Sequence, residues 1–170
     1  ALVMVLFAFA LDADAVLDLH CDGEGLLHLY TTPDTWDQAE VLARCVGAEA
    51  ALIAGRSGGE PFDEACSMVW PELAQRFGPD KPLPPSCMAA TIELRGEGDV
   101  RHELAAQDAA GIVRFLVARG CVSDPAAVPL PPLRCAPTPL AGSIPLVAPH
   151  GGMVVFRRQP GEQVRAGEAI

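Results

Sequence analysis

The sequence predicts an α/β protein, because short apolar strands alternate with helical segments along most of the chain. The expected strands are 15–20, 26–31, 50–54 and 88–95. The expected helices are 1–11, 32–47, 62–77 and 102–119. Strands that alternate with helices usually form a sheet with helices packed on its faces, so this is the predicted fold class.

Individual residues support these helix boundaries. Thr32 precedes Pro33, and this pair favours a helix start because Thr caps free N–H groups and proline fits the first turn. Gly120 suits the residue that ends the last helix. Pro71 predicts a break within 62–77, because proline lacks the N–H that a helix interior needs.

The composition changes after residue 122. Residues 123–140 are rich in proline, which predicts a stiff, extended linker after an α/β domain at 1–122. Residues 141–170 contain apolar strands separated by Pro-Gly and Gly-Gly turns, which predicts a small, truncated β domain. The chain starts without methionine inside an apolar run, so we expect it to be a fragment of a longer protein.

Charge and cysteine usage narrow the class of partner. The formal net charge of −10 disfavours binding to nucleic acid or to an anionic membrane. The apolar run 1–11 is shorter than the roughly 20 residues that a membrane-spanning helix needs. The 6 cysteines are scattered without a CxxC pair, which is typical of reduced thiols in a cytoplasmic protein. A small-molecule substrate is the expected partner, and the sequence leaves a homo-oligomer open.

Three polar residues within predicted strands are candidates for chemistry. Asp18 and His20 share a strand face, and a histidine there can either bind zinc or hydrogen-bond to a loop. Glu93 interrupts an apolar strand, where burial of a carboxylate costs free energy unless the group is paired or used. Either Arg95, on the same predicted face, forms an ion pair with Glu93, or Glu93 is a general base. His28 alternates with apolar residues and is predicted to have a surface or packing role.

Two motifs carry a family resemblance. The segment 16–22 (VLDLHCD) and the later segment 91–96 (TIELRG) resemble the succinylglutamate desuccinylase and aspartoacylase family of zinc-dependent deacylases. The proline-rich linker and the segment 148–167 are similar to the C-terminal β domain of that family. The resemblance implies part of a zinc-carboxypeptidase-like mixed sheet with flanking helices, followed by a small all-β half-barrel segment.

The resemblance also implies an activity and a site. The activity would be hydrolysis of an amide bond in an N-acyl amino acid or a similar small molecule. His20 would bind zinc, and Glu93 would be the general base that takes a proton from zinc-bound water. Arg95 and Arg56 are the candidates for binding a substrate carboxylate.

One motif of the family is missing from the sequence. The HxxE motif supplies the other two zinc ligands in the family, but no histidine here has glutamate at the third following position. The simplest interpretation is that the N-terminal part of the enzyme is not in this chain. The alternative function is a non-catalytic binding or assembly fragment. A lipoyl-like carrier role is disfavoured, because the single lysine, Lys81, lies outside 141–170.

Overall fold

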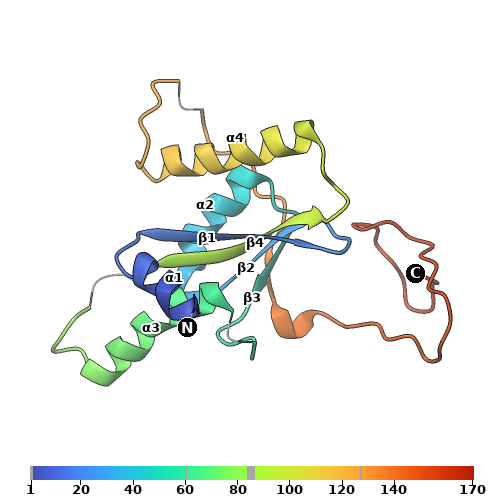
Figure 1. Ribbon diagram of the computed structural model, residues 1–170, viewed down its shortest axis with the longest axis horizontal. Helices are drawn as coiled ribbons and strands as arrows, with labels where there is room; N and C mark the ends of the chain where they lie inside the picture. Colours follow the sequence, from blue (N-terminus) through green and yellow to red (C-terminus); the bar gives the residue numbers. More distant parts are fainter. Residues whose placement is uncertain (1, 60, 84–86, 127) are drawn as a thin grey trace.

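The computed structural model describes residues 2–59, 61–83, 87–126 and 128–170, and it confirms the predicted α/β class (Figure 1). A five-stranded sheet has the strand order β1-β4-β2-β3-β5. The strands are β1 (Ala15–Asp22), β2 (Leu27–Thr31), β3 (Ala50–Ile53), β4 (Met88–Gly96) and β5 (Pro137–Pro139). The α-helices are α1 (Leu2–Ala10), α2 (Trp36–Val46), α3 (Phe62–Phe77) and α4 (His102–Ala118). The position Ala1, where the sequence places the start of the first helix, lies outside the described residues.

The sheet is mixed, and its direction changes between two neighbouring strands. β1 runs parallel to β4, whereas β2 runs antiparallel to β4. β3 runs parallel to β2, and β5 runs parallel to β3. The longest strand, β4, is therefore hydrogen-bonded on both sides and lies within the sheet rather than at its edge.

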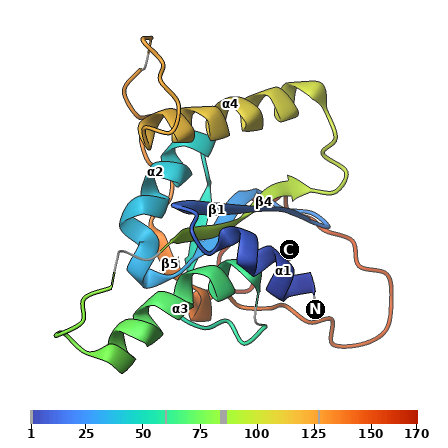
Figure 2. The same ribbon diagram turned by 60° about the vertical axis from the view of Figure 1, so that its left-hand side comes forward.

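Two helix layers cover opposite faces of the sheet, α2 and α4 on one and α1 and α3 on the other (Figure 2). On the first face, Leu29 and Ile92 from the sheet pack with Leu42 of α2 and Phe115 of α4, and all four are fully buried. Burial of each such side chain contributes about 1.5–3 kcal/mol of hydrophobic stabilisation. A smaller cluster on the other face is centred on Ala89.

The helix boundaries follow the signals in the sequence with one exception. A 3₁₀ turn begins at Pro33 after Thr32, and α2 follows it and ends at Gly47, which adopts a left-handed conformation. The expected break before Pro71 is wrong, because α3 continues through this residue to Phe77. Pro71 has no N–H to donate to the carbonyl of Ser67, so the helix tolerates the loss of one internal hydrogen bond there.

The end of the predicted linker is part of the sheet. Pro137–Pro139 forms β5, which pairs with β3 from Ala51↔Pro137 to Ile53↔Pro139. A strand with two prolines fits this position because an edge strand needs hydrogen bonds on one side alone. The linker and the sheet are therefore connected through main-chain pairing.

Beyond a 3₁₀ turn at Leu140–Gly142, the structure has no helix or strand in the described residues 143–170. This segment extends away from the sheet (Figure 1), and apolar side chains such as Ile144 and Met153 are more than 80% exposed. Gly161 lies close to Leu26: a Cβ added at this glycine would be 3.1 Å from Leu26 Cδ1. The β domain at 141–170 stays a prediction.

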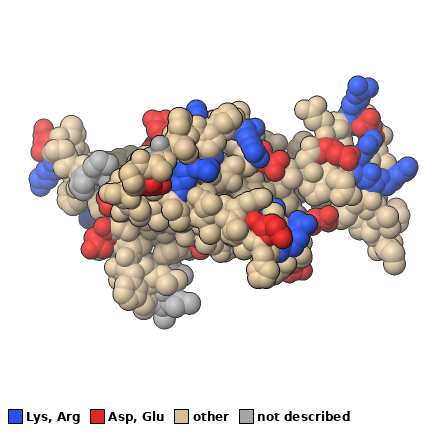
Figure 3. All heavy atoms as spheres, turned by 90° about the horizontal axis from the view of Figure 1, so that it is seen from above, with Lys and Arg blue, Asp and Glu red and all other residues tan. Residues whose placement is uncertain are grey.

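Charges of both signs mix on the surface. On the face drawn in Figure 3, Lys and Arg side chains lie among Asp and Glu, and no continuous basic patch is visible. Within the described ranges, no helix combines the length and the apolar character that crossing a membrane requires. The cysteines in the described part of the chain form no disulfide.

The packing of α4 against α2 predicts the effect of one glycine substitution. A Cβ at Gly111 would lie 2.9 Å from the Cys45 carbonyl oxygen and 2.9 Å from Val46 Cα, both backbone atoms that cannot rotate away. We expect Gly111→Ala to lower the free energy of unfolding by about 1–3 kcal/mol despite the better helix propensity of alanine. Thermal and urea unfolding measure this loss.

The matched control is Gly98→Ala, because no atom lies within 4 Å of a Cβ at Gly98. This control should leave the unfolding free energy within about 0.5 kcal/mol of the wild type. Equal stabilities of the two variants would contradict the close approach of α2 and α4.

Candidate active site

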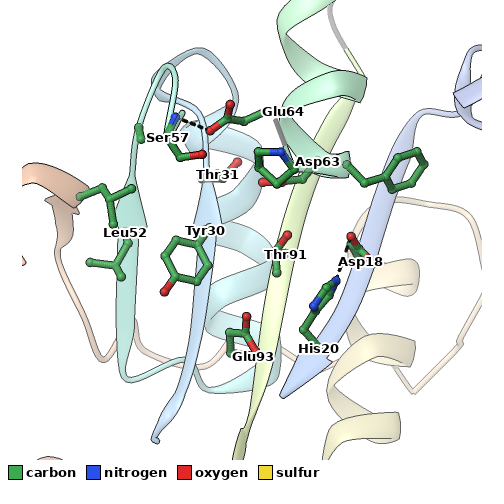
Figure 4. Close-up of a pocket in the computed structure, with 14 residues that line it drawn as sticks. Asp18, His20, Tyr30, Thr31, Leu52, Ser57, Asp63, Glu64, Thr91 and Glu93 are labelled. Carbon is green, nitrogen blue, oxygen red and sulfur yellow. Dashed lines mark hydrogen bonds and ion pairs between the residues drawn. The ribbon is translucent and has the colours of Figure 1, made fainter. Parts of the chain in front are cut away.

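A cavity of about 430 Å³ lies on the face of the sheet that carries α1 and α3 (Figure 4). Its floor combines three strands, because the register places Asp18 and Tyr30 on either side of Thr91 and places His20 beside Glu93. Paired residues in a sheet point to the same face, so these side chains converge. The cavity is lined by Asp18, His20, Tyr30, Thr31, Leu52, Ala54, Ser57, Pro61, Phe62, Asp63, Glu64, Thr91, Glu93 and Leu140.

Asp18 and His20 form the pair that the sequence pattern predicts. Asp18 Oδ2 lies 3.1 Å from His20 Nε2, and the His20 side chain is 51% exposed. A carboxylate that accepts a hydrogen bond from one ring nitrogen orients the imidazole and leaves the other nitrogen for a ligand. The pair can therefore hold an oriented imidazole at the open side of the cavity.

Glu93 has the environment of a proton acceptor. Its Oε2 atom is buried and has no hydrogen-bond partner among the described residues. Burial raises the pKa of the Glu93 carboxyl, and the Asp22 carboxylate raises this pKa further, whereas His20 and His28 lower it. A carboxylate whose pKa lies above its ordinary value is a better general base near neutral pH.

His28 is held by hydrogen bonds on both ring nitrogens. Its Nδ1–H donates to the Leu26 carbonyl oxygen at 2.8 Å, and Nε2 lies 3.3 Å from the Tyr30 hydroxyl. The ring also meets the Tyr30 ring edge to face at 5.2 Å. These contacts agree with the predicted packing role, and they fix the Tyr30 ring at the edge of the cavity.

Asp63 is a cavity residue that the sequence analysis missed. It lies in the first turn of α3, is 3% exposed, and has an Oδ1 atom without a hydrogen-bond partner in the described part of the chain. Burial raises the pKa of Asp63, although hydrogen bonds from the Glu64 backbone and from the Thr91 side chain oppose this shift. The sequence does contain a signal for the buried position of Asp63, because its helical spacing places it on one stripe of α3 with the buried Cys66 and Ser67.

The structure does not bring Arg95 to the cavity. Arg95 Nη2 binds Asp108 Oδ1 of α4 at 2.5 Å, on the opposite side of the sheet from Glu93. The expected Glu93–Arg95 ion pair is therefore wrong. The physical reason is a bulge: between His20↔Glu93 and Asp22↔Gly96, β4 has one residue more than β1, and Arg95 has a positive φ of 70°.

Arg56 also lies outside the cavity lining. It forms an ion pair with Glu72 of α3, and its side chain is 71% exposed. Substrate binding by Arg56 or Arg95 stays a prediction, and their observed partners do not support it.

The described residues do not complete a zinc site. The described ranges contain no group of three or more His, Cys, Asp or Glu side chains arranged to hold a metal ion. A structural or catalytic zinc site uses at least three protein ligands. His20 is the residue of the cavity best suited to bind zinc, and further ligands would have to come from outside the described residues.

The mixed α/β sheet thus carries an oriented imidazole, His20, and a partly buried glutamate, Glu93, in one cavity. Two solved structures share this fold. One is from Shewanella frigidimarina NCIMB 400 and is named for succinylglutamate desuccinylase/aspartoacylase, with a TM-score of 0.81 and 27% identity. The other is from Shewanella amazonensis SB2B and is named for the same family, with a TM-score of 0.68 and 28% identity. The resemblance predicted from the two sequence motifs is confirmed.

These comparisons cover most of this chain but a smaller part of the relatives. The first covers 96% of this chain and 43% of the relative, and the second covers 84% and 38%. No family model matches the sequence, and no curated protein matches it. The chain therefore spans less than half the length of the structures that it resembles.

The environment of Asp63 predicts a pH-dependent stability cost. Because its pKa is raised in the folded protein, the folded state binds this proton more tightly than the unfolded state does. This contribution favours folding at acidic pH and is lost as the pH rises through the folded-state pKa. We expect Asp63→Asn to be more stable than the wild type at neutral pH and equally stable at acidic pH, in thermal melts across that range.

Asp37→Asn is the matched control, since Asp37 is exposed in the first turn of α2. It should lack the stability gain at neutral pH. Loss of stability in Asp63→Asn at neutral pH would contradict a net cost of burying the ionised Asp63 carboxylate.

Proposed function

We propose that this chain carries part of the active site of a deacylase that hydrolyses an amide bond of a small N-acyl compound. The observation that carries the proposal is the Glu93 carboxylate, buried on one oxygen and placed beside His20 in a cavity of substrate size. The names of the structural relatives support a deacylase-like function. An N-acyl amino acid or a similar amide is the proposed substrate.

Glu93 performs the proton transfers in this proposal. Its carboxylate takes a proton from a water molecule, and the water oxygen attacks the amide carbon and forms a tetrahedral intermediate. The protonated Glu93 then gives the proton to the amide nitrogen, the carbon–nitrogen bond breaks, and the amine leaves. The upward shift of the Glu93 pKa suits the first step, because it makes the carboxylate a stronger base than an ordinary glutamate.

We assign His20 as one ligand of a zinc ion. The Asp18 carboxylate, 3.1 Å from His20, would orient the ring and increase its basicity. Because the described residues contain no group of three possible ligands, the other ligands of such an ion would have to come from elsewhere. A cytoplasmic location is part of the same proposal.

The alternative is a non-catalytic binding or assembly chain. The lack of a three-ligand metal group within the described residues favours it. The two functions differ in what Glu93 does: a general base is needed for turnover, whereas in a binding module the same residue affects stability alone.

Glu93→Gln tests the proposed catalytic role. Glutamine keeps the shape of the side chain but cannot accept the proton, so we expect kcat to fall by about 10²–10⁴-fold. The measurement is release of amine from N-acyl substrates by the chain in the presence of Zn²⁺, with circular dichroism to confirm folding.

Glu97→Gln is the control, because Glu97 follows β4 and is exposed. It should keep wild-type turnover. Equal rates for Glu93→Gln and the wild type would exclude Glu93 as the base, and absence of hydrolysis of all substrates tested would favour the binding module.

His20→Ala tests zinc ligation independently of activity. We expect this change to weaken Zn²⁺ binding by at least about tenfold in calorimetric titration, because ligating groups and their supports contribute at that level. His102→Ala, at the exposed start of α4, should bind Zn²⁺ as the wild type does. Identical zinc affinities for wild type and His20→Ala would contradict the assignment.

A further inference from the structure

We propose that Tyr30 binds the substrate: its hydroxyl oxygen accepts a hydrogen bond from the amide N–H and thereby favours amides over esters. This specificity rests on the amide hydrolysis proposed above. Tyr30 lines the cavity from β2, the strand that pairs with the Glu93-bearing strand β4.

The hydroxyl group of Tyr30 lies near the proposed base. His28 is directly opposite Glu93 in the antiparallel pairing of β2 with β4. The Tyr30 hydroxyl oxygen lies 3.3 Å from His28 Nε2, which brings it close to the level of Glu93 along the sheet. On the other side of β4, the register pairs His20 with Glu93. Glu93 therefore lies between the Tyr30 side chain and the His20 imidazole (Figure 4).

A secondary amide fits between these two groups. The amide unit is planar and normally trans, so its C=O and N–H bonds point in opposite directions. When the amide carbon lies over Glu93 and the carbonyl oxygen points toward His20, the N–H points toward Tyr30. One orientation of the substrate therefore exposes the carbon to the base and gives the N–H a partner.

The contact with His28 makes the Tyr30 oxygen a hydrogen-bond acceptor. His28 Nδ1–H donates to the Leu26 carbonyl oxygen at 2.8 Å, so Nε2 is the acceptor in the neutral ring. The Tyr30 O–H donates to Nε2, and the oxygen lone pairs are left for a ligand. Burial raises the pKa of Tyr30, and the Asp22 and Glu93 carboxylates raise it further, so the hydroxyl group stays protonated. Within an amide, the N–H is the group that can donate to this oxygen.

Packing alone does not account for the hydroxyl group. The Tyr30 and His28 rings meet edge to face at 5.2 Å, and a phenylalanine would make the same contact. The hydrogen bond of 3.3 Å is longer than the usual range of roughly 2.7–3.2 Å, and Asp22 Oδ2 lies 3.5 Å from the same His28 nitrogen. The His28 contact thus directs the hydroxyl hydrogen, and the oxygen accepts no hydrogen bond from the described residues.

The test uses two compounds that differ in one group. N-acetyl-L-alanine has the N–H, whereas O-acetyl-L-lactate has an oxygen at that position, and each is assayed with the chain and Zn²⁺. We expect Tyr30→Phe to lower kcat/KM for the amide by about tenfold, because the N–H loses its partner. The same variant should change kcat/KM for the ester by less than about twofold. Ser123→Ala removes an exposed hydroxyl group outside the cavity lining and should change neither value.

Two results would overturn the inference. Equal losses for the amide and the ester would indicate a contact with the shared carbonyl group or a structural effect. An unchanged kcat/KM for the amide would show that the hydroxyl group does not bind the N–H. A thermal melt confirms that Tyr30→Phe is folded.

Calorimetric titration of the same two compounds separates this inference from the proposed function. If neither is hydrolysed but the amide binds, and Tyr30→Phe loses about tenfold in affinity for the amide alone, the deacylase proposal fails and the N–H site stands. If the amide is hydrolysed and Tyr30→Phe leaves the ratio of amide to ester kcat/KM unchanged, the deacylase proposal stands and this inference fails. Absence of both hydrolysis and binding overturns both.

Discussion

The pairing of β4 with strands on both sides is the constraint on which the site depends. β4 holds β1 in parallel register and β2 in antiparallel register, so its pleat decides which side chains of three strands share a face. Thr91 and Glu93 point to the cavity, and Ile92 between them is fully buried in the core with Leu29 and Phe115. A shift of one residue in this register would exchange the core side chains for the polar ones, so the hydrophobic core enforces the geometry of the site.

The same pleat explains why Arg95 does not reach Glu93. If the side chains of β4 continued to alternate between the two faces, Arg95 would lie on the face of Glu93, and the two charges would neutralise each other. The bulge before Gly96 turns it toward Asp108 of α4 instead. The ion pair then joins the strand to the helix on the core side, and the carboxylate of Glu93 keeps its unpaired oxygen. A local irregularity of the backbone thus separates the Arg95–Asp108 ion pair from the Glu93 carboxylate in the cavity.

Much of the fold could be predicted from the sequence, because the apolar strands and the residues around Thr32, Gly47 and Gly120 are local signals. Two features could not be predicted: α3 continues through Pro71, and Pro137–Pro139 forms an edge strand. In both places tertiary packing or strand pairing overrides the local preference of proline. For the site, the shared face of Asp18 and His20 followed from strand periodicity. The bulge at Arg95 and the inward direction of Asp63 depend on contacts between segments distant in the sequence. Residue periodicity cannot reveal the bulge, whereas the helix spacing of Asp63 does indicate a buried position.

The position of Asp63 links the stability of α3 to the charge of the cavity. A carboxylate in an apolar environment is destabilised, and an arginine partner would be the common remedy. Here the positive end of the helix dipole at the start of α3 offers a partial remedy of up to about 2 kcal/mol. The dipole belongs to the backbone and does not occupy the Oδ1 atom, which is buried without a hydrogen-bond partner among the described residues. A helix start, together with the hydrogen bonds from the Glu64 backbone and from Thr91, can therefore hold a buried carboxylate without an arginine partner.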